Sequence, residues 1–317
     1  MTVAGIMDTL AAALKDVTME LTWINKLRIA AVAALGMVVI GILAWPLAAP
    51  ADPLLPVRAW NTSSSGTIIL LSLAFGVGFV GYFIAWPHGR EIGILGVPFG
   101  LAVWAGRSGP MRVLTQALTK PDEREALLHS LRFEPAYWLL IVAAGFAGVL
   151  AAQRLRPGSR PAPTLAQIKS RLNPGLYLNA AVALLVSMVL IAFFTGVFAQ
   201  DLCTSYEMVA AQPAVGQIFF AILGAFGTAA FVVKKFLNLS YLWPAVAGPL
   251  VLPFADAVYG NSQTVAKFAE TEPATFFPHA IFAILPLQFV ALGAIGAVTG
   301  YWMAVRYEYW RKHESAG

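Results

Sequence analysis

Long runs of apolar residues, separated by short polar stretches, dominate the chain. We interpret eight of these runs as transmembrane helices, because a helix needs about 20 apolar residues to cross roughly 30 Å of hydrocarbon. The eight predicted spans are residues 29–45, 67–86, 92–105, 135–152, 176–199, 215–233, 241–259 and 277–304. The pattern therefore predicts an all-α polytopic integral membrane protein.

Two of the eight segments are unusual. Segment 92–105 is short and rich in glycine, and segment 241–259 contains three prolines. Both residue types weaken a helix, so either segment could enter the membrane and return without crossing it. The distribution of basic residues favours crossing.

If all eight segments cross, one side of the membrane holds both termini and the loops 87–91, 153–175 and 234–240. This side then carries most of the 21 Lys and Arg residues, although loop 106–134 on the other side is also basic. Short cytoplasmic loops are enriched in Lys and Arg. We therefore expect both termini in the cytoplasm, and we expect a bacterial inner (plasma) membrane as the location.

Composition agrees with a lipid environment. Only 12% of the residues are charged and 59% are hydrophobic, whereas soluble domains average about 25% charged residues. The basic pI of about 9.4 does not indicate nucleic-acid binding, since the basic residues lie in short loops between apolar runs. The lipid bilayer is the partner that the composition predicts.

The N-terminal segment, residues 1–25, has the pattern of an amphipathic helix. Apolar residues recur there at three- and four-residue spacing, while Asp8, Lys15, Asp16 and Glu20 occupy the other face. Such a helix lies on the membrane surface or docks against a partner. Other subunits of a membrane complex are the partners that it would fit.

Short echoes indicate an internal duplication. "LGVPFGLAVW" at 95–104 resembles "LVLPFADAVY" at 250–259, "GTIIL" at 66–70 resembles "GQIFF" at 216–220, and "EPAYW" at 134–138 resembles "EPATF" at 272–276. The echoes keep their order, which favours two copies of a four-helix unit. We predict a first repeat at 26–157, a basic cytoplasmic linker at 158–175 and a second repeat at 176–317. Four spans per copy would make the repeats parallel. Convergent lipid-facing composition is the alternative.

The sequence shows no recognisable catalytic or cofactor motif. It contains no Gly-rich phosphate loop and no His or Cys pattern with metal-ligand spacing. Of the four histidines only His279 lies in a predicted span, which disfavours a transmembrane haem held by two histidines. We accordingly predict no catalytic residue, no metal and no cofactor.

Ionisable residues inside membrane segments are costly and usually face protein or water. Asp256 is the only acid well inside a predicted span, His279 lies near the start of the last span, and Glu134 and Glu272 begin the fourth and eighth. One interpretation is a polar substrate or ion site formed by Asp256, His279 and Glu272. In the other, Asp256 pairs with Arg107 or Lys267, and the two glutamates stabilise helix N-termini.

The repeat sharpens the interest in Asp256. Leu101 takes the matching position in the first copy, so the carboxylate belongs to the second copy alone. Pro98 and Pro253 match each other and are predicted helix-break positions, as in transporters with interrupted helices. Helix packing would also explain them.

Three functions are open at this stage. The first is a transporter or permease for a small solute or ion, which the duplication, the interrupted helices and Asp256 favour. The second is a non-catalytic membrane subunit of a larger respiratory or energy-converting complex, which the scarcity of interior polar residues and the N-terminal helix favour. A membrane enzyme ranks below both.

Overall fold

The structure is a computed structural model, and it describes residues 23–118, 120–155, 174–199, 210–271 and 276–314. This part of the chain is helical, with one isolated β-bridge between Ala210 and Phe277. Seven helical segments are long and apolar enough to cross a membrane: Trp23–Leu43, Ser64–Ile84, Pro121–Arg154, Tyr177–Ala199, Val215–Leu237, Leu242–Tyr259 and Pro286–Arg311. The expectation of a polytopic helical membrane protein is confirmed at this level.

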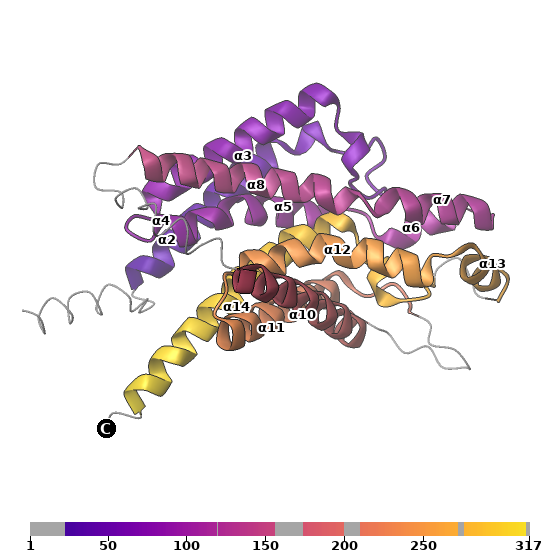
Figure 1. The fold of residues 1–317 in the computed structure, drawn as a ribbon. Helices are drawn as coiled ribbons and strands as arrows, with labels where there is room; N and C mark the ends of the chain where they lie inside the picture. The colour runs from indigo at the N-terminus through magenta and orange to yellow at the C-terminus, as the bar shows by residue number, and fades with distance from the viewer. Residues whose placement is uncertain (1–22, 119, 156–173, 200–209, 272–275, 315–317) are drawn as a thin grey trace, which may run out of the picture.

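In Figure 1 the helices of the first half lie above those of the second. The first half contains α2 (Trp23–Gly36), the π-helix η1 (Met37–Leu43), α3 (Ser64–Ile84), α4 (Gly89–Ile92), η4 (Gly93–Leu95), α5 (Gly96–Arg107), α6 (Met111–Gln116), α7 (Pro121–Leu131) and α8 (Glu134–Arg154). The second half contains α10 (Pro174–Ala199), α11 (Val215–Leu237), α12 (Leu242–Tyr259), α13 (Ser262–Thr271), η5 (Ala280–Ala283) and α14 (Pro286–Glu314).

The predicted span at 92–105 is not among the seven candidates, but it returns the chain across the bundle. Helices α3 and α8 run in the same direction. Near their first turns Thr67 Oγ1 lies 3.2 Å from Tyr137 Oη, and near their last turns Tyr82 packs with Val149 and Ala152. The chain between them must therefore come back, and α4, η4 and α5 follow one another without a gap over 89–107.

Helices α11 and α14 of the second half also run in the same direction. Lys234 Nζ lies 4.0 Å from Glu308 Oε2 near their C-terminal ends, and the Phe231 and Tyr307 rings meet at 5.9 Å. Further back, a Cβ added to Gly300 would collide with the Gly227 backbone. Helix α12 lies between α11 and α14 in the sequence and carries the chain back.

The two halves meet along α5 and α14. Val97, Leu101 and Ala105 of α5 share one buried cluster with Leu287 and Val290 of α14. Helix α14 is the most deeply packed span, with 72% of its apolar window buried inside the protein, because α5, α8, α11 and α12 all contact it. Figure 1 shows α14 beginning among these helices, with its C-terminal turns extending beyond them.

The predicted start of the last span at residue 277 is wrong, because α14 begins at Pro286. Proline is favoured at the first position of a helix, and the residue before a proline is disfavoured in the helical region. Residues 277–285 instead contain the bridge to Ala210 and the short helix η5. His279 therefore precedes the span, with an extended backbone at φ −157° and ψ 146°.

Several sequence-based predictions lie outside the described residues. They are the amphipathic helix over most of 1–25, nearly all of the linker 158–175, and Glu272. Those predictions stay as they were made.

Candidate functional site

The site is built around Asp256, in the last turn of α12. Its side chain is only 3% exposed, and it lies on the helix face that also buries Leu252 and Ala255. The carboxylate is covered because α7 from the first half packs across this end of α12.

Two residues of the first half hold the carboxylate. His129 Nδ1 lies 2.8 Å from Asp256 Oδ2, and Arg132 Nη1 lies 3.8 Å from the same oxygen. We call Asp256, His129 and Arg132 the inter-half clasp. Arg107, a partner suggested by the sequence, instead places its guanidinium over the ring of Trp45 at 4.2 Å.

His129 also faces a second carboxylate. Its Nε2 lies 3.5 Å from Glu125 Oε1, one turn earlier on α7. The side-chain exposure is 28% for Glu125, 45% for His129 and 3% for Asp256. The imidazole thus sits between a carboxylate near the surface and a buried one.

Apolar burial brings α7 to this position. Leu127, Leu128 and Leu131 point into a buried cluster that also contains Val251 and Ala255 of α12 and Val265 of α13. The same helix keeps Glu125 and His129 at its more exposed side. A helix from the first half therefore completes the core of the second, and this docking fixes His129 opposite Asp256.

A second ion pair lies next to the clasp, within the first half. Arg58 Nε donates to Glu134 Oε1 at 3.0 Å, and Arg58 Nη2 donates to Ser130 Oγ at 3.0 Å. Glu134 occupies the first turn of α8, as the helix N-terminus interpretation expected. Burial lowers the pKa of Arg58, while the carboxylate of Glu134 counteracts this effect. Arg58 and Glu134 support the segment that carries His129 and Arg132.

Two glutamines add neutral contacts across the boundary, and sequence reasoning missed both. Gln212 Oε1 accepts from the Arg112 backbone N–H at 3.0 Å, and its Nε2 donates to the Ala283 carbonyl at 2.9 Å. Gln288, 3% exposed in the first turn of α14, donates to the Ala105 carbonyl of α5 at 3.4 Å. The signal that could have found Gln288 in the sequence is a polar residue inside an apolar run, two positions after Pro286.

His279 lies beside the same end of α12. Its ring stacks on Tyr259 with centroids 4.9 Å apart, and its Nδ1 accepts from the Ile281 backbone N–H at 3.2 Å. Burial lowers the pKa of His279. The neutral ring therefore caps η5. Its stacking partner Tyr259 lies three residues after Asp256 on α12.

The two predicted helix-break positions differ. Pro253 lies inside α12, where it cannot donate to the carbonyl four residues earlier. Pro98 is the third residue of α5 and follows the 3₁₀ turn η4, so it starts a helix and interrupts none. The matching prolines therefore have different local surroundings.

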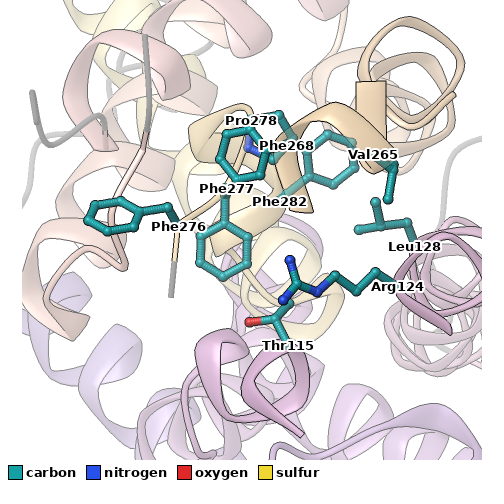
Figure 2. Close-up of a pocket in the computed structure, with 9 residues that line it drawn as sticks. All are labelled: Thr115, Arg124, Leu128, Val265, Phe268, Phe276, Phe277, Pro278 and Phe282. Atoms are coloured by element: carbon teal, nitrogen blue, oxygen red, sulfur yellow. The ribbon is translucent and has the colours of Figure 1, made fainter. Parts of the chain in front are cut away.

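A small cavity of about 40 Å³ lies close to the clasp, between α6, α7, α13 and the segment before η5. Figure 2 shows aromatic rings around it, with the Arg124 side chain reaching toward Thr115. Its lining residues are Thr115, Arg124, Leu128, Val265, Phe268, Phe276, Phe277, Pro278 and Phe282. Arg124 Nε donates to the Leu118 carbonyl at 3.1 Å, so this guanidinium also holds the loop before α7.

Across the described ranges, no three His, Cys, Asp or Glu side chains gather in a way that could hold a metal ion. No family model, curated protein or solved structure matches the chain. The geometry of the clasp is therefore the basis for a functional proposal. His129 was not singled out from the sequence, because it stands in a polar loop far from Asp256 along the chain.

Proposed function

We propose that the protein is a transporter or permease for a small solute or an ion. The observation that carries this proposal is the contact between Asp256 and His129. A buried carboxylate in one half of a membrane bundle meets a titratable ring of the other half at 2.8 Å. A charge change at this contact alters the attraction between the halves, and transport of this kind requires the halves to move against each other.

A duplicated four-helix unit, which we infer from the sequence echoes, is part of the same proposal. Helices α3 and α8 approach closely enough that a Cβ on Gly78 would collide with the Gly145 backbone, and Gly300 meets Gly227 in the same way between α14 and α11. In each half two parallel helices therefore approach through glycines, with α5 or α12 returning between them, and this likeness supports a duplicated unit. In this proposal the chain crosses the membrane eight times. The echo between 134–138 and 272–276 is not part of the proposed duplication, because α14 begins ten residues after residue 276.

Movement of the halves can be tested at Gln288, which is buried between α14 and α5. We would place a single cysteine there in a Cys203→Ser background and measure its reaction with a membrane-impermeant maleimide in proteoliposomes. A transporter exposes the position intermittently, and Asp256→Asn raises the labelling rate because it weakens the clasp. Complete protection in both proteins, together with no flux of protons or of radiolabelled amino acids and sugars, would sink the transport proposal.

A non-catalytic subunit of a larger membrane complex is the second candidate. The described cavity near the clasp holds only about 40 Å³, whereas ligand pockets usually measure about 300–1,000 Å³. The boundary between α5 and α14 is filled with apolar side chains, as a static anchor would require. Purification from native membranes in a mild detergent tests this candidate, and a chain that purifies alone argues against it.

A further inference from the structure

Glu125, His129 and Asp256 lie in contact where α7 meets α12, and among them the His129 side chain is the most exposed at 45% while Asp256 is buried. The two contacts measure 3.5 Å, from Glu125 Oε1 to His129 Nε2, and 2.8 Å, from His129 Nδ1 to Asp256 Oδ2. Each carboxylate uses a different ring nitrogen. Histidine is suited to this position, because its two nitrogens allow a proton to enter at one and leave from the other.

We infer that these three residues form a proton relay, so that the proton is the coupling ion of the transporter; the inference rests on the proposed function. The relay starts from the tautomer in which His129 Nδ1–H donates to the Asp256 carboxylate and Nε2 can accept a proton. A proton from water reaches Nε2 directly or through Glu125. The Nδ1 proton then transfers to Asp256 Oδ2, which leaves a neutral carboxylic acid and a neutral ring protonated at Nε2.

Proton arrival has a mechanical consequence. A neutral Asp256 no longer attracts the Arg132 guanidinium, whose Nη1 lies 3.8 Å away. The charge that joins α7 of the first half to α12 of the second is then lost. The other carboxylate oxygen, Oδ1, lies against Gly260 and has no hydrogen-bond partner in the described part of the chain.

Further charged groups lie on the surrounding elements. Lys267 and Glu270 are exposed on α13, Arg124 donates to the Leu118 carbonyl, and Glu134 of α8 is paired with Arg58. Glu123, also on α7, lies 3.6 Å from Lys120 and is 41% exposed. Glu123 is therefore a matched control for Glu125, with the same side chain on the same helix.

Infrared difference spectroscopy of the full-length protein in nanodiscs tests the relay directly. After a drop in pH we expect a carbonyl band of a protonated carboxylic acid that Asp256→Asn removes. His129→Gln should slow its appearance by at least about tenfold, as loss of a proton-transfer group does. Glu125→Gln should slow it less, and Glu123→Gln should leave it unchanged. If the band is absent, or if it appears at the same rate in His129→Gln, the relay is overturned.

Proton flux in proteoliposomes separates the relay from the proposed function. The probe is a pH-sensitive dye inside vesicles that carry an imposed potassium diffusion potential. An infrared band that depends on His129, without proton flux and without cysteine exposure at position 288, supports the relay and overturns transport. Exposure at position 288 without the infrared band supports transport and overturns the relay. The infrared band together with proton flux, each reduced in His129→Gln, supports the two together.

Discussion

The Nδ1 atom of His129 lies 2.8 Å from the Oδ2 atom of Asp256, although the two residues are 127 positions apart in the sequence. The contact joins a helix of the first half to a span of the second. It pairs a carboxylate that is 3% exposed with a ring that is 45% exposed. Burial makes the carboxylate dependent on its partners, and exposure keeps the ring in reach of protons from water.

The pair should show energetic coupling. In a double-mutant cycle with His129→Gln and Asp256→Asn, we expect a coupling free energy on the order of 1–2 kcal/mol. This range lies between the values typical of exposed ion pairs and those of hydrogen bonds to a buried charged group. Unfolding in detergent, followed by circular dichroism, measures it. The control cycle pairs Lys120→Gln with Glu123→Gln, whose exposed pair should show less than about 1 kcal/mol. Equal coupling in both cycles would contradict the assignment.

Residues before and after α4–α5 should lie on opposite sides of the membrane. We would introduce single cysteines at His88 and at Lys120 in a Cys203→Ser background, with Lys26→Cys as a control that shares the side of His88. An impermeant maleimide should label His88→Cys and Lys26→Cys from one face of oriented vesicles, and Lys120→Cys from the other. Labelling of His88→Cys and Lys120→Cys from the same face would show that the segment enters and returns.

Glycine contacts between parallel helices should be sensitive to one added methyl group. A Cβ on Gly78 of α3 would overlap the Gly145 carbonyl of α8, so Gly78→Ala forces the helices apart. We expect a loss of about 1–3 kcal/mol, typical of overpacking, seen as a lower midpoint of thermal unfolding. Gly76 lies on the same helix, and nothing stands within 4 Å of its added Cβ. Gly76→Ala should leave stability unchanged or raise it slightly, because alanine favours a helix.

Stability should fall at acidic pH partly because of His279. Burial lowers the pKa of this ring, so the unfolded chain takes up a proton at a higher pH than the folded protein does. The contribution of His279 is therefore complete above about pH 6.5 and is lost as the pH falls below that value. His279→Asn keeps an acceptor for the Ile281 N–H and removes the titration. We expect it to flatten the dependence of the melting temperature on pH between pH 5 and 7.

Long apolar runs were sufficient to predict the seven helices that are long and apolar enough to cross a membrane, apart from the start of the last one, because a helix in lipid must satisfy its own backbone and must be apolar over its length. The segment 92–105 was harder to assign from the sequence. Its glycines, among them Gly96 and Gly100, are needed for close approach to Gly36 and Ile40 of the first span. Because this close packing requires glycines, the sequence of the buried helix resembles that of a weak span.

The sequence by itself determined the class of protein and most of the apolar helices, and it singled out Asp256 as a charge inside an apolar run. It could not supply the partners of that charge. His129 and Arg132 reach Asp256 only because Leu127, Leu128 and Leu131 draw α7 onto the other half. That docking depends on side chains distant in sequence, so the tertiary structure alone decided what the carboxylate faces.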